Sequence, residues 1–489
     1  MAKSIPPPLI VHGNPYHDPV FAASPHNNLA HDPVHVRTAT YVVAASDAPA
    51  HMKAQADYVC DGTDDQVEIQ AAIDAAFNDQ GGIVFLPPGT YTITSLEVRE
   101  GVTLQGSSRW ARGWTGGGAR QRSTWIHCVS EIDPAITMRM YTSLKNLVFF
   151  YPNQVTDFAG GGAPTVYPAT ITATIGTGRV LIRDVAAINP YVFIDISLLH
   201  ELLTIENVNA YPLYRGLVLD NSVDIDRISN VHFNPNIWPD MPIGGNLPKW
   251  VFANATAFDI GRLDWARFYN CFCFGYQFGF HLKNLGSGVP KQILLHGCGA
   301  DRCYYPFFVR WGWGIKIIDC DAVSSNEYDA AEITGPAVNI SSGDTIVENL
   351  RIWGSTSTGI RVLGTAGHPT SNVTIRGCNI MEYGVNAHAG HFAYGIIIND
   401  YATNVIVEGN QVDGQARAWS TGILLYGVNR NNQITIIANN VRNTGPAGIS
   451  MGVGPVDVIC TNNLLKATAG LTDNLGAVSK VVTNNITVP

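Results

Sequence analysis

Charged residues are scarce in this 489-residue chain, since Asp, Glu, Lys and Arg make up only 14% of it, against roughly 25% in typical soluble proteins. The net charge is −9, and no run of Lys or Arg interrupts the acidic balance. The sequence therefore lacks the basic patch of a nucleic-acid-binding protein. No stretch of about 18 apolar residues occurs, so we expect no membrane insertion. Residues 1–8 lack the basic region and apolar core of a signal peptide.

Cysteine occurs in no pattern that binds zinc or builds a disulfide framework. The nine cysteines are odd in number, and Cys271 and Cys273 lack the second pair that a zinc ribbon requires. We expect small buried thiols in a chain that folds under reducing conditions, and no metal or other cofactor.

Glycine is abundant, with 48 residues, and Asn is frequent in the second half of the chain. Together with many Val and Ile residues, this composition favours strands joined by tight turns over exposed amphipathic helices. The patterns along the chain divide it into three regions: an arm at 1–55, an opening segment at 56–129 and a repetitive region at 130–489.

The arm at 1–55 is rich in His and Pro and sustains no helical or strand period. This pattern predicts an extended arm or linker. The favoured role is packing against partner subunits. The alternative is a metal site built from His12, His17, His26, His31 and His35.

The opening segment contains the signature of one helix followed by strands. The run from Thr63 to Gln66 has the form of a capping box, with Thr63 as the N-cap. Apolar residues then follow at helical spacing as far as Phe77. Acidic residues around Thr63 are expected to cap this helix and not to catalyse. Residues 83–86 and 90–93 are predicted strands separated by a turn.

One short unit recurs through residues 130–489, marked by a small polar residue after a strand. Consecutive members lie 22 to 41 residues apart, and several intervals are too short for a propeller blade of about 40–45 residues. The members are Asn146, Asp184, Asn207, Asn230, Cys271, Cys298, Cys320, Asn349, Cys378, Asn410, Asn439, Asn462 and Asn484. The predicted fold class is all-β: a right-handed parallel β-helix (solenoid) with a short N-terminal capping helix and an extended N-terminal arm.

In such a solenoid, one residue per coil occupies the same turn, about 4.8 Å from its neighbour. An inward Asn can bond the turn backbone and the next Asn, and Cys is a small apolar substitute. The column is therefore expected to be structural. A second strand recurs once per coil, and His281, Asn339 and Arg361 share its outward position. They form either a polar stripe lining a groove or ordinary surface.

At residues 56–76 and 81–91 the chain resembles the pectate-lyase-like β-helix superfamily, and most of all the tailspike and tail-fibre proteins of bacteriophages. The resemblance implies a homotrimer that binds a bacterial surface polysaccharide. It also implies that residues 1–55 join the virion tail or baseplate. Such a protein is made in the host cytoplasm and acts outside the cell after lysis.

The chain departs from the enzymes of this superfamily. It contains neither the Trp-Ile-Asp-His motif of the pectate lyases nor the Gly-His-Gly and Arg-Ile-Lys motifs of the polygalacturonases. No catalytic residue is therefore carried over from the resemblance.

Candidate catalytic acids follow from the repeat itself. Asp319 and Glu348 each precede a member of the column, so they are expected to be neighbours in the stack. Two carboxyls about 5–5.5 Å apart suit a retaining glycosidase. The alternative is a solvated face with a nearby cation such as Lys316. Asp301 and Glu327 flank the aromatic stretch at 304–313 and are further candidates.

Aromatic residues gather near these acids, and sugars stack on aromatic rings. Tyr304, Tyr305, Trp311 and Trp313, with Arg310, are the candidate carbohydrate-binding residues. The longest insertion, between 230 and 271, adds Trp238, whose alternative role is contact with a neighbouring subunit.

Three functional hypotheses result. The first is a tailspike that binds and depolymerises a polysaccharide, by hydrolysis or elimination. The second is a non-enzymatic receptor-binding fibre or structural tail protein. The third is a secreted cellular lyase or epimerase, which the missing signal peptide disfavours.

Overall fold

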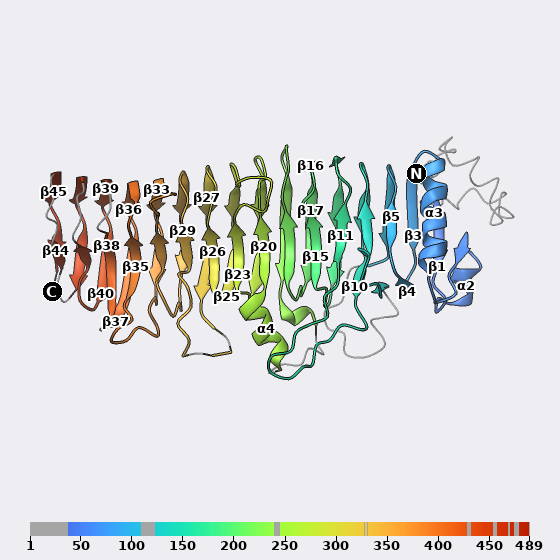
Figure 1. The fold of residues 1–489 in the computed structure, drawn as a ribbon, viewed down its shortest axis with the longest axis horizontal. Helices are drawn as coiled ribbons and strands as arrows, with labels where there is room; N and C mark the ends of the chain where they lie inside the picture. Colours follow the sequence, from blue (N-terminus) through green and yellow to red (C-terminus); the bar gives the residue numbers. More distant parts are fainter. Residues whose placement is uncertain are drawn as a thin grey trace, which may run out of the picture.

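The chain is described here from a computed structural model that covers residues 38–108, 123–238, 245–326, 328–329, 331–427, 432–452, 457–467, 470–473 and 479–488. These residues wind into a rod in which each coil lies against the next (Figure 1). The strands pair in parallel between successive coils, in a sheet of 30 strands and a sheet of 14. The predicted all-β, right-handed parallel β-helix is confirmed.

The larger sheet receives two strands from a typical coil. Its strands are β1 (Tyr41–Ala44), β2 (Tyr58–Val59), β3 (Gly82–Leu86), β4 (Gly89–Ile93), β6 (Val102–Gly106), β7 (Thr124–Cys128), β9 (Ser143–Lys145), β10 (Val148–Phe150), β13 (Leu181–Arg183), β14 (Ala186–Ala187), β17 (Thr204–Ala210), β19 (Arg227–Phe233), β21 (Arg267–Tyr269), β22 (Phe272–Phe274), β24 (Leu294–His296), β25 (Gly299–Cys303), β27 (Ile315–Ile318), β28 (Asp321–Ser324), β30 (Thr345–Glu348), β31 (Arg351–Ile352), β33 (Thr370–Arg376), β34 (Asn379–Met381), β36 (Ala402–Glu408), β37 (Gln411–Arg417), β39 (Asn432–Ile437), β40 (Asn440–Thr444), β42 (Asp457–Thr461), β43 (Leu464–Ala467), β45 (Ser479–Thr483) and β46 (Ile486–Thr487).

The smaller sheet receives one strand from each coil. Its strands are β5 (Leu96–Val98), β8 (Ile136–Met138), β11 (Ala169–Ala173), β15 (Val192–Ile196), β18 (Arg215–Leu219), β20 (Thr256–Ile260), β23 (Phe278–Leu282), β26 (Tyr305–Val309), β29 (Val338–Ile340), β32 (Ile360–Val362), β35 (Ala393–Ile398), β38 (Ser420–Leu425), β41 (Ile449–Met451) and β44 (Leu471–Asp473). A separate pair joins β12 (Thr177–Gly178) to β16 (His200–Glu201).

The described helices are short: α2 (Ala50–Lys53), α3 (Gln66–Asn78), the 3-10 turn η3 (Pro235–Ile237) and α4 (Asn246–Asn254). Within the described part of the chain, no helix has the length and apolarity needed to cross a membrane. Helix α3 lies across the N-terminal end of the rod (Figure 1) and buries Ile69 and Ile73 there. The predicted capping helix is thus confirmed.

The capping box at Thr63, however, is wrong. Helix α3 has Asp65 as its N-cap residue, without a side-chain cap bond, and Thr63 Oγ1 donates instead to Asp61 at 2.9 Å. The buried carboxylate of Asp65 accepts from the backbone N–H groups of Gly62 at 2.8 Å and Thr92 at 2.7 Å. Asp65 therefore ties the start of the helix to β4, and this contact between separate segments overrides the local capping pattern.

The predicted arm at 1–55 is too long at its C-terminal end. Strand β1 pairs with β2 and β3, and it buries Val43 and Ala44 in the first coil. Residues 38–55 thus belong to the β-helix, because the first full coil needs a parallel partner on its open edge. The His residues proposed for a metal site lie outside the described residues: His12, His17, His26, His31 and His35.

The predicted Asn/Cys column consists of two adjacent columns. Seven of its members have a left-handed backbone, with φ between 52° and 57°: Asn146, Asp184, Asn207, Asn230, Asn349, Asn462 and Asn484. The other six follow that bend by one residue and point inward: Cys271, Cys298, Cys320, Cys378, Asn410 and Asn439. The sequence pattern did not separate the two columns, because Asn suits both a left-handed bend and a buried turn.

The inner column continues with Asn463 and Asn485 as an asparagine ladder. Asn439 Nδ2 donates to Asn463 Oδ1 at 3.0 Å and to the Val407 carbonyl at 3.0 Å. Asn439 Oδ1 accepts from the backbone N–H of Asn410 at 3.0 Å. The amides therefore satisfy turn groups that the strand pairing does not reach.

The cysteines of the inner column make the equivalent contact. Cys298 Sγ lies 3.6 Å from the carbonyl of Phe268, at the position that Val407 occupies relative to Asn439. Cys is therefore a weak donor here as well as a small apolar residue. All nine cysteines are buried and free, which confirms the expectation of buried thiols.

Replacing one inner amide tests the ladder. Asn439→Ala leaves the backbone N–H of Asn410 without its acceptor, so we expect a loss of about 2 kcal/mol in the free energy of unfolding. Denaturant titration followed by circular dichroism measures it. Asn462→Ala is the matched control, because Ala438 already occupies that column with φ 57°. An equal loss in both variants would contradict the two-column assignment.

Candidate functional site

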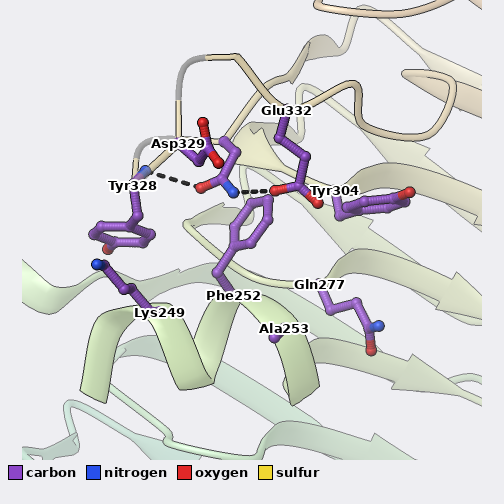
Figure 2. A pocket seen from close by; sticks show the side chains of 9 residues that line it. Lys249, Phe252, Ala253, Gln277, Tyr304, Tyr328, Asp329 and Glu332 are labelled. Atoms are coloured by element: carbon purple, nitrogen blue, oxygen red, sulfur yellow. Dashed lines mark hydrogen bonds between the residues drawn. The ribbon is translucent and has the colours of Figure 1, made fainter. Parts of the chain in front are cut away.

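A pocket of about 380 Å³ opens beside α4, between this helix and the loop that follows β28. Figure 2 shows its walls. Its lining residues come from four successive coils: Lys249, Phe252, Ala253, Gln277, Tyr304, Asn326, Tyr328, Asp329 and Glu332.

Three aromatic rings form the floor and sides of the pocket. Phe252 rises from α4 between Tyr304 and Tyr328 (Figure 2), with ring centroids 6.2 Å and 6.3 Å away. Lys249, one helical turn earlier on α4, extends toward Tyr328. The insertion that carries α4 therefore brings an aromatic side chain and a cation to residues of later coils.

Polar contacts hold the loop on the other side. The Asn326 amide donates to the Glu332 carboxylate, and Asn326 Oδ1 accepts from the backbone N–H of Tyr328 at 2.8 Å. Asp329 Oδ1 accepts from the backbone N–H of Ala331 at 3.0 Å. The Asn386 amide donates to the Glu332 backbone carbonyl at 3.1 Å. The loop thus presents two carboxylates to the pocket in a fixed arrangement.

An aromatic platform lies on the outer face of the smaller sheet and consists of Phe278, His281, Tyr305 and Phe308. The Phe278 ring stacks on His281 with centroids 4.3 Å apart and on Tyr305 at 5.3 Å. His281 stacks in turn on Phe308 at 5.3 Å. These rings are outward side chains of β23 and β26, which pair in the register Phe278 to Tyr305 and His281 to Phe308.

The platform and the pocket are continuous. Tyr304 lines the pocket and Tyr305 belongs to the platform, and their ring centroids lie 4.9 Å apart. Gly335 sits directly against Tyr305, and a Cβ at this position would overlap the ring. The glycine therefore allows the close packing that holds Tyr305 in place.

A buried ion cluster borders the platform. The Asp259 carboxylate on β20 is fully buried and lies 3.0 Å from Lys283 Nζ and 3.2 Å from the Arg215 guanidinium. Burial raises the pKa of Asp259, while the Lys283 and Arg215 charges oppose that rise. Burial and the nearby cations lower the pKa of His281 to about 3, so its ring is neutral at neutral pH.

The pairing expected for Asp319 and Glu348 is wrong in its register. Glu348 lies opposite Ile318, while Asp319 lies opposite Asn349 and accepts from its amide at 2.7 Å. Each carboxylate also has its own side-chain partner: the Arg376 guanidinium lies 2.8 Å from Glu348, and His296 Nε2 lies 3.1 Å from Asp319. Both are surface acids on the larger sheet, each with a separate partner. The expected register was wrong because the prediction treated two adjacent columns as one.

Asp301 is a partly buried acid close to the pocket residue Tyr304. It lies on β25, three residues before Tyr304, and its Oδ1 is buried without a hydrogen-bond partner among the described residues. Burial raises the pKa of Asp301, an effect that the nearby Arg302 partly offsets. The backbone carbonyl of Asp301 accepts a hydrogen bond from the backbone N–H of Gly275. Gly275 in turn lies beside the pocket residue Tyr328, since a Cβ added to this glycine would be 3.7 Å from the Tyr328 hydroxyl. The fourth candidate acid, Glu327, lies outside the described residues.

The structure separates the predicted sugar-binding aromatics into two groups. Tyr304 and Tyr305 lie at the start of β26, beside the pocket. Trp311 and Trp313 follow its other end, roughly 15–20 Å along the strand direction. Trp311 contacts Arg310 and His368, with centroid distances of 5.6 Å and 5.9 Å. Trp313 is 41% exposed beside Lys291.

Trp238 is half-buried and packs against the hydrophobic core next to η3, so it does not reach the pocket. The helix of the same insertion reaches it instead. The sequence pointed to a long insertion near 230–271 but not to Lys249 and Phe252, because it does not reveal which later loop the insertion meets. The predicted shared register of His281, Asn339 and Arg361 is observed. Phe308 of the platform lies in the same register, between His281 and Asn339.

Two family models match parts of the chain. The right handed beta helix region matches residues 301–486, and the model described as rhamnogalacturonase A/epimerase, pectate lyase-like, matches residues 53–154. Both agree with the observed fold. No curated protein matches the chain.

Several solved structures are similar to the chain. The A-module of the Azotobacter vinelandii mannuronan C-5 epimerase AlgE6 is 17% identical, with 88% of this chain and 97% of that chain covered and a TM-score of 0.39. ORF18 of Geobacillus virus E2 is 11% identical, with 87% and 59% covered and a TM-score of 0.28. The catalytic unit of a GH87 alpha-1,3-glucanase from Streptomyces thermodiastaticus is 14% identical, with 86% and 66% covered and a TM-score of 0.31. At these identities the likeness concerns the fold alone.

The raised pKa of Asp301 predicts how stability depends on pH. Because its pKa in the folded state lies above the ordinary 3.8, the folded state favours the neutral carboxyl, and this contribution is lost as the pH rises through the folded pKa. Asp301→Asn should therefore raise the free energy of unfolding at neutral pH by roughly 0.5–1 kcal/mol. The gain should vanish under acid conditions.

Thermal unfolding across a pH series measures this difference. Asp319→Asn is the control, because it removes a carboxylate that has side-chain partners in the Asn349 amide and His296, and it should not stabilise the protein. A destabilised Asp301→Asn variant at neutral pH would contradict the assignment of an unsatisfied, half-buried carboxylate.

Proposed function

We propose that this chain is a tailspike-like protein that binds, and depolymerises, a bacterial surface polysaccharide. The observation that carries the proposal is the continuity of an open, aromatic-walled pocket with a platform of stacked rings, both bordered by carboxylates.

The chemistry of the two surfaces suits a glycan. The apolar face of a pyranose packs on aromatic rings, while its hydroxyls need polar partners. Phe252, Tyr304 and Tyr328 supply such rings in the pocket, and Gln277 and Asn326 supply amides beside them. An extended chain of sugars fits an elongated surface of this kind better than a small compact ligand does.

Cleavage is supported by carboxyls in different environments. Glycosidases pair an acid of raised pKa with an ionised carboxylate. Asp301 has the raised pKa, and Asp329 and Glu332 are carboxylates at the pocket. We assign Asp301 as the proton donor and Glu332 as the second carboxyl group of the pair.

Tyr304 tests the binding surface. Tyr304→Ala removes a ring shared by pocket and platform, so affinity for the target glycan should fall about tenfold. Tyr269→Ala is the matched control, because Tyr269 is a 42% exposed tyrosine on the larger sheet. Purified capsular polysaccharides immobilised on a sensor provide the measurement. Equal affinities of the two variants would refute the assignment.

Release of reducing ends distinguishes the enzyme from the alternative, a non-enzymatic receptor-binding fibre. Asp301→Asn should bind the same glycan but release reducing ends at least 100-fold more slowly, since loss of a general acid typically costs about 10²–10⁴ in rate. If wild-type protein binds the glycan and leaves its mass distribution unchanged, the fibre is the correct assignment.

The proposal includes a homotrimer whose N-terminal residues attach to a virion tail or baseplate. Apolar side chains on the outer face of the larger sheet support contact between subunits, since Ile459 and Val481 are 46% and 51% exposed in the same register. Light scattering should give the mass of three 52.8-kDa chains. Replacing both residues by Lys should dissociate the trimer, and a monomeric wild type would refute it.

A further inference from the structure

Basic side chains gather on the outer face of the smaller sheet, although the net charge of the protein is −9. Arg215 lies on β18, Lys283 and Arg310 directly follow β23 and β26, and Arg361 lies on β32. We call these four residues the basic face. They surround the aromatic platform, and the Lys283, Arg310 and Arg215 charges all act on His281 within it.

Two of these cations share one carboxylate, and the other two have no carboxylate partner among the described residues. Arg215 and Lys283 share the buried Asp259 carboxylate. Arg310 and Arg361 lie within ion-pair distance of no carboxylate among the described residues. The other acid in the register of Asp259 is Asp195. It lies two strands away, with Val218 of β18 between them. The basic face therefore retains positive charge beside the platform.

Arg361 is held in place by a neutral side chain. Its Nε donates to Asn339 Oδ1 at 2.8 Å, so the guanidinium is held in place by a neutral partner. Burial lowers the pKa of Arg361, but an arginine stays protonated in proteins. A largely buried charge without a counter-ion is unfavourable for folding. An anion that arrives with a ligand would supply the missing partner and a bidentate contact.

The strand register places the Arg361 guanidinium within reach of a sugar bound on the platform. Phe308, Asn339 and Arg361 occupy the same outward position on three successive strands, so Arg361 lies about 10 Å from Phe308 across the sheet. Tyr305 of the platform lies near Arg361, close enough for its ionised form to raise the pKa of Arg361. Both ring nitrogens of His281 are buried and have no hydrogen-bond partner among the described residues.

We propose that the basic face is a subsite for the carboxylate of an acidic sugar, with Arg361 as its main anion-binding residue and Arg310 as the second. This inference rests on the proposed function and names its substrate class: a polysaccharide that carries uronic acid or another carboxylated sugar. The platform binds the ring of the sugar, and the guanidinium groups bind its charge.

The experiment uses the full chain and a panel of purified acidic and neutral bacterial capsular polysaccharides. Each acidic polysaccharide is also tested after chemical reduction of its carboxyls to alcohols. We expect the wild type to bind an acidic polysaccharide, to bind its reduced form at least tenfold more weakly, and to lose affinity as salt rises.

Arg361→Met removes the charge and keeps an apolar side chain. Its affinity for the acidic polysaccharide should fall about 10- to 100-fold, while its melting temperature should be equal to or above that of the wild type, because an unpaired charge has been removed. Arg376→Gln on the larger sheet removes a charge at a surface ion pair and should bind normally. A purely structural role for Arg361 would instead lower the melting temperature.

The outcomes separate the two proposals. If only neutral polysaccharides bind, or if reduced and native forms bind equally, the acidic subsite is refuted and the glycan-binding function stands. If Arg361→Met binds as the wild type does, the assignment of Arg361 is refuted. If no polysaccharide binds, the proposed function and this inference fail together.

Discussion

Each coil of this molecule depends on the next one to satisfy its backbone. Strands of one coil donate to and accept from the following coil, and the bends between strands use the inner column for the groups that strand pairing leaves over. Asn supplies both a donor and an acceptor at this position, and Cys supplies a weak donor in the same direction. A buried N–H without a partner costs about 1–3 kcal/mol, so the column fixes register as well as stability. A shift of one residue would turn every side chain of a strand to the other face.

That fixed register positions the aromatic platform, the proposed binding surface. Outward side chains of successive strands lie about 4.8 Å apart, which brings Phe278 onto Tyr305 and His281 onto Phe308 although the members of each pair are 27 residues apart in sequence. Loops leave the stack at the bends, where added length does not disturb the pairing. The insertion with α4 and the loop after β28 use this freedom, and together with Tyr304 they line the pocket.

The sequence was sufficient for the fold and insufficient for the site, for physical reasons. Periodicity predicted the coils, the helix through Phe77 and the shared register of His281, Asn339 and Arg361, because these features repeat along the chain. It misplaced the Asp319 and Glu348 pair by one residue, since Asn is common in both a left-handed bend and a buried turn. Phe252 and Lys249 had no periodic pattern to reveal them, because their place depends on a contact between two irregular loops.

The contrast between the interior and the outer face argues for function on the smaller sheet. Along the inner column the described amides are paired in a continuous ladder, as a structure selected for stability requires. On the outer face the protein keeps Asp259 buried among cations and holds Arg361 against a neutral amide. Both ring nitrogens of His281 are without partners in the part of the chain that the structure describes. Apolar residues at these positions would serve the scaffold better. Such groups persist where a rigid framework determines their positions, and the stacked coils provide that framework, so the polar groups of this face are best explained by a ligand.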